Sequence, residues 1–186
     1  MIKLWTVQDK KVLDTIQRDG VYYPDFNKSY YKELIPELDQ LYAFMLLCYN
    51  VNNDTRYSGL AYTFLGVDGE YIASFPNYDY FKEYIQSKEG VIKSLWNKLS
   101  REDSVILELN YEDDFNPILM DINDFQYLMP PQSVMPPFNE ESLGIIAINA
   151  AHGSFGRSAL PSGLIQAHVG EIRKENIVGV YPMFEL

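Results

Sequence analysis

Two short apolar segments near the ends of the chain constrain its fold most. They are residues 4–8 (LWTVQ) and residues 165–169 (IQAHV). Each segment is mostly apolar and carries one or two polar side chains, which is typical of a core strand that lines a site. We therefore predict that both segments are strands of one sheet. Because an indole ring buries a large area, we also predict that Trp5 is mostly buried there.

The other segments indicate further strands and helices without regular alternation. A helix is expected over residues 9–18, because Asp9 is a good N-cap and Gly20 a good stop. Asp68-Gly69 favours a hairpin between residues 60–65 and 71–75. Further helices are expected at 36–49, 79–87 and 91–99, and further strands at 105–111, 118–122, 143–150, 164–172 and 177–184. This order favours an α+β fold, a single domain over residues 1–186, with N-terminal and central helices packed on a mixed or antiparallel sheet.

Composition supports a packed core. The chain has 186 residues, of which 47% are hydrophobic, and a domain of this length buries roughly 70% of its unfolded surface. No apolar run approaches the ~20 residues that span a bilayer, and Lys3 interrupts any signal-peptide core. Cys48 is the only cysteine, so we predict a small buried thiol and no internal disulfide. These features predict a cytoplasmic protein without a membrane partner.

The net charge of −11 is concentrated between residues 101 and 141. Arg101 is the only base of that stretch, which holds ten acids: Glu102, Asp103, Glu108, Glu112, Asp113, Asp114, Asp121, Asp124, Glu140 and Glu141. Such a field repels nucleic acid, so direct DNA or RNA binding is disfavoured. Two interpretations remain: a solvated face that aids solubility, or a surface that binds a basic protein.

Three groups of residues resemble the bacterial and phage family designated domain of unknown function 3841. They are residues 4–8 followed by the helix that ends at Gly20, residues 105–109 running into 118–125, and residues 165–169 running into 172 and 177–178. Their order covers nearly the whole chain. Because the family has no assigned biochemistry, the resemblance implies no reaction.

A second resemblance concerns the fold. The opening strand, the helix and the extended segment after Gly20 are similar to the start of ADP-ribosyltransferase-like folds. In those folds one residue of the first strand and one residue of a late strand bind NAD. The corresponding positions are Thr6 or Gln8, and Gln166 or His168. The late-strand glutamate of the transferases is missing there, since Glu171 lies later in the same run.

A loop with ligand-binding chemistry follows the apolar segment 143–150. Residues 151–158 (AHGSFGRS) contain two glycines, two hydroxyls and Arg157. Backbone amides of such a turn can hold an anion, and Arg157 can add a bidentate contact. The alternative is a plain connection, since Pro161 and Gly163 do not allow the long helix that a dinucleotide fingerprint needs.

Gln166 and His168 alternate along a strand and therefore face the same side of a sheet. If that side is the core, they are hydrogen-bonded buried groups. If it is a cleft, Gln166 can form hydrogen bonds with an amide of a ligand, and His168 can bind phosphate or transfer a proton. The same alternatives apply to a group of tyrosines that either stack on a planar ligand or fill the core: Tyr71, Tyr78, Tyr80 and Tyr84.

The carboxylates after the strand at 105–111 do not predict a metal site. Glu112, Asp113 and Asp114, with Asp121 and Asp124, are hard-cation ligands by chemistry. However, they lack calcium-loop spacing with its central glycine. These five residues are instead our candidates for the partner-binding acidic face.

Two functional hypotheses follow. In the first, a nucleotide- or NAD-binding domain of ADP-ribosyltransferase-like architecture brings together Thr6, Gln8, Arg157, Gln166 and His168. In the second, a non-enzymatic phage or mobile-element inhibitor binds a basic protein through the acidic stretch 101–141. The first is favoured because its residues lie on strands that flank the glycine-containing loop. A shared apolar pocket would distinguish it from an exposed acidic surface.

Overall fold

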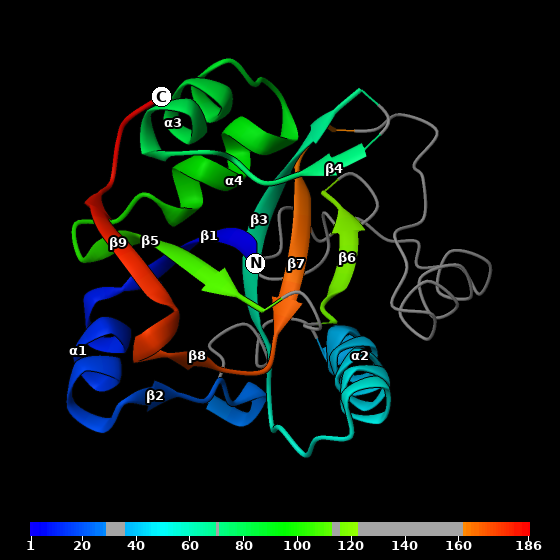
Figure 1. Ribbon diagram of the computed structural model, residues 1–186. Helices are drawn as coiled ribbons and strands as arrows, with labels where there is room; N and C mark the ends of the chain where they lie inside the picture. The colour runs from blue at the N-terminus through cyan, green and yellow to red at the C-terminus, as the bar shows by residue number, and fades with distance from the viewer. Residues whose placement is uncertain (29–35, 70, 113–115, 123–161) are drawn as a thin grey trace.

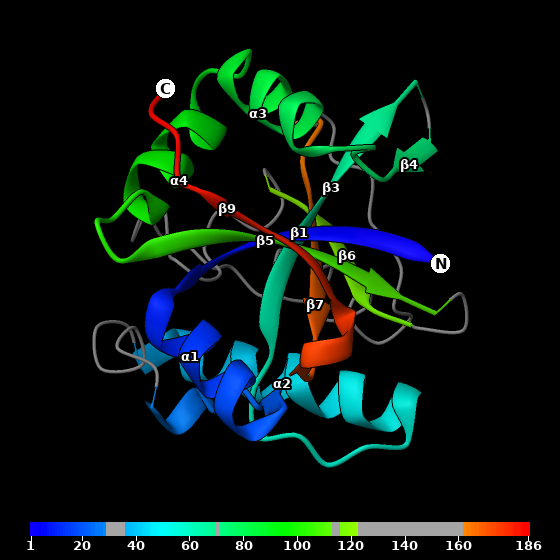
Figure 2. The same ribbon diagram turned by 60° about the vertical axis from the view of Figure 1, so that its left-hand side comes forward.

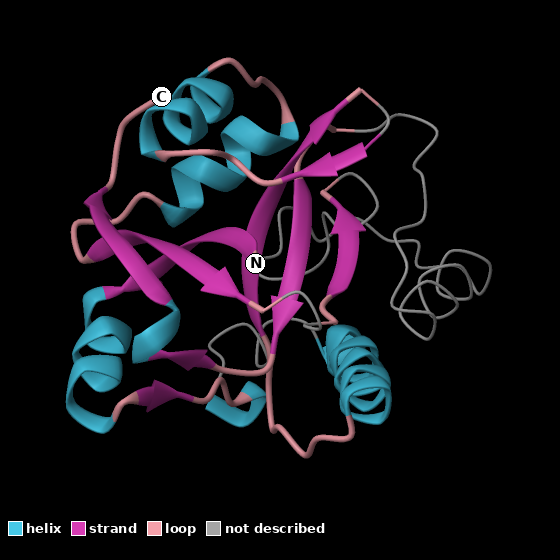
Figure 3. Cartoon of the chain, in the orientation of Figure 1, coloured by secondary structure: helices cyan, strands magenta, loops and turns pink. Residues whose placement is uncertain are grey.

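The computed structural model describes residues 1–28, 36–69, 71–112, 116–122 and 162–186 (Figure 1). Within these ranges helices pack on a mostly antiparallel sheet, which confirms the predicted α+β class (Figure 3). The helices are α1 (Lys10–Asp19), α2 (Pro36–Asn53), α3 (Tyr78–Gln86) and α4 (Val91–Leu99), with 3-10 turns η1 (Phe26–Lys28) and η3 (Lys174–Asn176). The strands are β1 (Ile2–Asp9), β2 (Val21–Tyr22), β3 (Ala61–Asp68), β4 (Tyr71–Ala73), β5 (Ser104–Tyr111), β6 (Ile118–Asp121), β7 (Ile165–Val169), β8 (Ile172–Arg173) and β9 (Ile177–Pro182).

The two apolar end segments lie in one sheet, as predicted. The strand order is β6-β7-β3-β1-β5-β9, with β4 paired to β3. β1 pairs with β5 along its whole length, whereas its register with β3 is the single pair Trp5↔Phe64. Figure 2 shows the reason: β1, β5 and β9 cross the direction of β3 and β7. The strands β1 and β3 therefore meet at one point and diverge beyond it.

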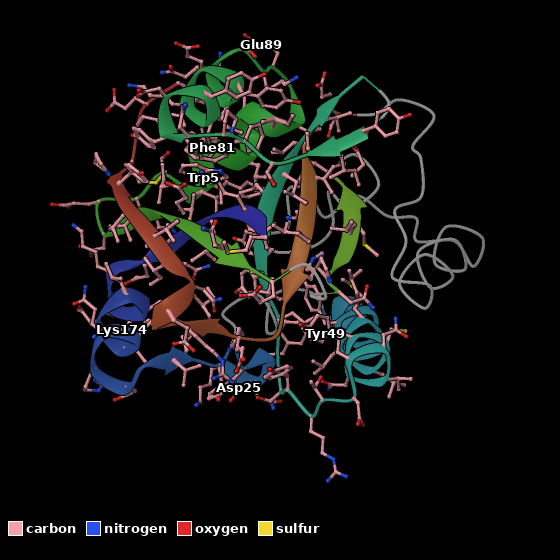
Figure 4. All side chains as sticks on the ribbon, in the orientation of Figure 1. Trp5, Asp25, Tyr49, Phe81, Glu89 and Lys174 are labelled. Atoms are coloured by element: carbon pink, nitrogen blue, oxygen red, sulfur yellow. The ribbon has the colours of Figure 1, made fainter. Side chains whose placement is uncertain are left out.

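The sheet carries a core on each face. On one face, Trp5 is fully buried and stacks on Phe81 of α3, with ring centroids 5.0 Å apart (Figure 4). The indole Nε1 also donates to the carbonyl of Phe75 at 3.2 Å. Trp96 of α4 stacks on Phe184 at 4.4 Å, which seals this core with the C-terminal segment. The prediction that Trp5 is buried in the sheet is confirmed.

The opposite face packs against α1 and the small β2–β8 sheet. Leu4, Leu107, Ile165 and Ala167 form its centre, and Ile16 of α1 is buried against them. α1 begins at the cap that the sequence predicts, since Asp9 accepts a hydrogen bond from Lys11 N at 2.8 Å. It ends at Gly20, whose φ of 84° suits glycine best. Local signals thus place the helix that covers this face.

One predicted element is wrong in its extent. Residues 164–172 do not form one strand, because β7 ends at Val169 and β8 begins at Ile172 in a different sheet. Gly170 lies at the break, where the ring of Tyr57 occupies the space beside its Cα. The expected strand at 143–150 lies outside the described residues. The predicted hairpin is confirmed, with Asp68 opposite Tyr71.

Candidate functional site

A pocket of about 260 Å³ lies where β1 and β3 diverge. Its walls come from the end of β1, the segment after β2 and the start of β3. The lining residues are Val7, Gln8, Tyr22, Tyr23, Pro24, Asp25, Phe26, Lys28, Leu60, Ala61 and Tyr62. Four of these residues are aromatic, and Gln8 is the one amide side chain among them. We call this hollow the Gln8 pocket.

Backbone contacts hold the outer wall of the Gln8 pocket in place. The amide of Phe26 donates to the carbonyl of Ser58 at 3.0 Å, and Asp25 forms an isolated bridge with Ser58. Gly59 permits this approach, because a Cβ there would lie 2.7 Å from the Pro24 carbonyl oxygen. Asp25 marks this wall in Figure 4. The wall is thus held by contacts within the fold.

A hydrogen-bond relay orients Gln8. The Thr6 hydroxyl donates to the carbonyl of Tyr62 at 2.8 Å, and Gln8 Nε2 donates to Thr6 Oγ1 at 2.8 Å. A carbonyl oxygen only accepts, so the hydroxyl must use its proton there and accept from Gln8. The amide nitrogen of Gln8 therefore faces Thr6. Its Oε1 makes no hydrogen bond with the residues that the structure describes.

The ionisable groups of the pocket wall are engaged locally. One carboxylate oxygen of Asp25 accepts from Asn27 N at 3.0 Å, and the other lies 3.5 Å from Lys28 Nζ. Burial, and then the nearby charge of Asp25, raises the pKa of Tyr22. The Tyr22 hydroxyl therefore stays protonated at neutral pH and available as a donor or acceptor.

A second hollow of about 190 Å³ adjoins the first and shares Val7, Gln8 and Tyr62 with it. Its remaining wall comes from α1, from the end of α4 and from the turn before β5. The polar residues on that wall are Asp9, Lys98, Arg101 and Ser104. Asp9 is engaged as the N-cap of α1. Two cations thus lie beside Gln8 in a chain of net charge −11.

Gln166 and His168 do not join Thr6 and Gln8. In the register of β3 and β7, Gln166 is opposite Phe64 and His168 opposite Tyr62. Those residues contribute to the face that Trp5 occupies, whereas Thr6 and Gln8 alternate with Trp5 on the opposite face. The predicted convergence of the four side chains in one cavity is therefore wrong. Both side chains are buried and His168 is hydrogen-bonded to Ile118, which favours the core interpretation over the cleft.

His168 is a neutral core residue. It is 6% exposed, and its Nδ1 lies 3.2 Å from the carbonyl of Ile118. Because that carbonyl only accepts, the proton of the ring resides on Nδ1. Burial lowers the pKa of His168 to about 4. An imidazole held in this way ties β7 to β6 and carries no charge at neutral pH.

The described acidic residues do not form one exposed face. Glu102, Asp103 and Glu112 are exposed, but Asp121 is fully buried and its carboxylate accepts from Ser162 N at 3.1 and 3.0 Å. Glu108 is buried too, 2.6 Å from Lys3 Nζ and 2.8 Å from the Tyr181 hydroxyl. Asp121 is thus a structural residue and not part of a partner-binding surface. Several residues of the two hypotheses lie outside the described residues: Asp113, Asp114, Asp124, Glu140, Glu141 and Arg157.

The tyrosines singled out in the sequence do not form one stacking surface. Tyr78 stacks on Tyr181 at 4.4 Å, and Tyr84 donates to the carbonyl of Gly163. Tyr71 and Tyr80 are exposed. The aromatic wall of the Gln8 pocket comes instead from the YYPDF run after Gly20, which we expected only as an extended piece. The aromatic, proline and aspartate residues of this run are the sequence signal that could have indicated the pocket wall.

A larger hollow of about 580 Å³ lies between β9 and the turn before β5. Two of its polar side chains, Lys10 and Tyr181, make contacts within the fold, whereas the buried Ser100 hydroxyl has no hydrogen-bond partner among the described residues. Lys10 Nζ contacts the carbonyl of Glu102 at 3.1 Å and the carboxylate of Asp103 at 4.0 Å, and Tyr181 bonds to Glu108. We take the Gln8 pocket as the better candidate because an amide held by Thr6 and four aromatic residues line the same hollow.

Comparisons with family models, with curated proteins and with solved structures find no match to this chain. The two resemblances drawn from the sequence therefore stay hypotheses. Among the helices that the structure describes, none has the length and apolar character to cross a membrane. Among the same residues, no group of three or more His, Cys, Asp or Glu side chains is placed to hold a metal ion.

Proposed function

We propose that this chain is a ligand-binding domain whose Gln8 pocket holds the planar ring of a nucleotide-class compound, a nucleobase or a nicotinamide. The observation that carries the proposal is the Thr6–Gln8 relay beside an aromatic wall. Ligand sites typically combine apolar walls with a few placed polar groups. The proposal keeps Thr6 and Gln8 from the sequence-based hypothesis and replaces Gln166 and His168 with the aromatic wall.

The relay specifies the edge of the ring that would bind. With Nε2 turned toward Thr6, Gln8 offers Oε1 as an acceptor and one remaining N–H as a donor. A ligand edge that carries a donor next to an acceptor matches both groups. Carboxamides and amino-substituted heterocycles carry such an edge. Purely apolar rings do not, and they would leave Gln8 Oε1 and the second Nε2 hydrogen without partners at a cost of about 1–3 kcal/mol.

The size and the walls of the pocket support a ring and not a whole dinucleotide. Small-molecule sites commonly occupy about 300–1,000 Å³, so about 260 Å³ accommodates one part of such a ligand. Tyr23 is 53% exposed at the rim and stacks against Tyr57, with ring centroids 6.1 Å apart. A planar ring entering beside Tyr23 would extend this stack, which favours aromatic ligands.

A thermal-shift and titration screen tests the proposal. The panel contains nicotinamide, NAD, the common nucleosides and their 5′-monophosphates. A compound at 100 times its dissociation constant should add about 2.7 kcal/mol to the free energy of unfolding. Gln8→Leu should weaken the best binder about fivefold, since one hydrogen bond contributes roughly 1 kcal/mol.

Gln17→Leu is the matched control, because Gln17 is exposed on α1 and lines none of the pockets described above. It should bind like the unmodified chain. Absence of binding across the panel, or equal weakening by Gln8→Leu and Gln17→Leu, would contradict the proposal.

A further inference from the structure

We infer that the ring bound in the Gln8 pocket carries a sugar, and that Tyr22 and Asp25 bind the sugar hydroxyls. The inference rests on the proposed function and adds the substrate class to it, a riboside and not a free base. Tyr22, the last residue of β2, and Asp25 line the same hollow as Gln8, which belongs to β1. A ligand that fills this hollow therefore meets polar groups from two separate parts of the chain.

The Tyr22 hydroxyl is a hydrogen-bonding group that the fold leaves unused. The side chain is half-buried, and its hydroxyl makes no hydrogen bond with the residues that the structure describes. Burial, and then the charge of Asp25, raises the pKa of Tyr22, so the hydroxyl keeps its proton and lies within electrostatic reach of that carboxylate. Because buried polar groups are normally hydrogen-bonded, a ligand that supplies a partner to Tyr22 is favoured.

Asp25 adds acceptor positions to the same wall. An ionised carboxylate offers about four acceptor positions, and the contacts of Asp25 with Asn27 N at 3.0 Å and Lys28 Nζ at 3.5 Å use two of them. Lys28 also compensates the charge of Asp25, which favours a neutral ligand group over a cation. A phosphate placed against this carboxylate would be repelled. The remaining acceptor positions therefore suit neutral donors such as hydroxyls.

A tyrosine hydroxyl near a carboxylate matches the hydroxyls of a sugar. Because a sugar hydroxyl both donates and accepts, it can donate to Asp25 while a sugar hydroxyl also accepts from Tyr22. Acidic side chains bind ribose hydroxyls in the same manner in dinucleotide-binding folds. A free base or nicotinamide has only its ring and the polar edge assigned to Gln8. The wall formed by Tyr22 and Asp25 therefore selects for the riboside.

The experiment compares each riboside with the same ring methylated at the glycosidic nitrogen, by titration calorimetry. Adenosine is paired with 9-methyladenine, and nicotinamide riboside with 1-methylnicotinamide. The members of a pair present the same edge to Gln8 and differ in the sugar. The riboside should bind at least about tenfold more tightly, because it adds hydrogen bonds of which one is to a charged group. Tyr22→Phe and Asp25→Asn should each reduce this ratio about fivefold or more.

The ratio of the two affinities separates sugar recognition from a loosened pocket wall. A wall that shifts in a variant weakens the riboside and the methylated ring alike, and leaves their ratio unchanged. Tyr71→Phe and Asp14→Asn are the matched controls, because both side chains are exposed and neither lines the Gln8 pocket. Both controls should keep the full ratio.

The outcomes also distinguish this inference from the proposed function. Equal affinities for ribosides and methylated rings would overturn the inference and leave ring binding intact. A riboside advantage that persists in full in Tyr22→Phe and in Asp25→Asn would overturn the assignment of the sugar to this wall. Failure of every compound to bind would overturn both the inference and the proposed function.

Discussion

Replacing Gly170 with alanine should destabilise the fold through a single steric conflict with Tyr57. A Cβ at position 170 would lie 2.2 Å from Tyr57 Cδ2 and 2.3 Å from its Cε2. Gly170 is not among the glycines with positive φ, so the added methyl group causes no backbone strain there. The whole effect therefore comes from the ring, which must move by more than 1 Å to reach ordinary contact distance.

Tyr57 has little freedom to make that movement. Its backbone N–H donates to Asn50 Oδ1 at 2.9 Å, and its ring packs on Tyr49 and Tyr23 with centroids 6.0 and 6.1 Å away. Burial, and then the charge of Glu171, raises the pKa of Tyr57 to about 12, so its hydroxyl remains protonated. Overpacking of this kind costs about 1–3 kcal/mol. We expect Gly170→Ala to lower the free energy of unfolding, measured with urea, by about 1–3 kcal/mol.

A double-mutant cycle isolates the conflict. In a Tyr57→Ala background the ring is gone, so adding Gly170→Ala should cost less than about 0.5 kcal/mol. If Gly170→Ala is as costly in that background as in the unmodified chain, the steric explanation is refuted. Because Tyr57 supports Tyr23 at the rim of the Gln8 pocket, Gly170→Ala should also weaken ligand binding.

Two further predictions concern the buried face that Trp5 occupies. Trp5→Ala should cost about 3–5 kcal/mol, because it removes a fully buried indole and the hydrogen bond to Phe75, and an unchanged urea midpoint would contradict this. Tyr71→Ala, at a ring that is 79% exposed, is its control and should stay within about 0.5 kcal/mol. The pKa of His168 is about 4 in the folded chain, against an ordinary value of 6.5. Between these two pH values the unfolded chain therefore binds more protons than the folded chain. The free energy of unfolding thus falls as the pH drops from 6.5 to 4. Between pH 7 and pH 4 the unmodified chain should lose about 3 kcal/mol more than His168→Gln, and identical losses would refute the burial of a neutral imidazole.

The sequence predicts this fold wherever the signals are local. The cap at Asp9, the stop at Gly20 and the turn at Asp68-Gly69 each specify an element through neighbouring residues, and the structure has all three elements. The break at Gly170 is different, because it depends on Tyr57, which approaches from a distant part of the chain. A run of apolar residues alone therefore predicts one strand where the structure has two.

The candidate site is predictable only in part for the same reason. Alternation along a strand correctly places Thr6 with Gln8, and Gln166 with His168, on shared faces. It does not say whether the two faces coincide, because the register between β1, β3 and β7 decides that. The aromatic wall is equally non-local, since the Pro24–Phe26 segment takes its position from Ser58 and Gly59.

The most direct test of the account is an amide chemical-shift map of the labelled chain titrated with its tightest-binding compound from the panel. We predict saturable shifts of the Gln8 side-chain amide together with backbone amides of residues 22–28 and 60–62. Shifts centred on Gln166 and His168, or no saturable shift with any compound, would contradict the Gln8 pocket as the binding site.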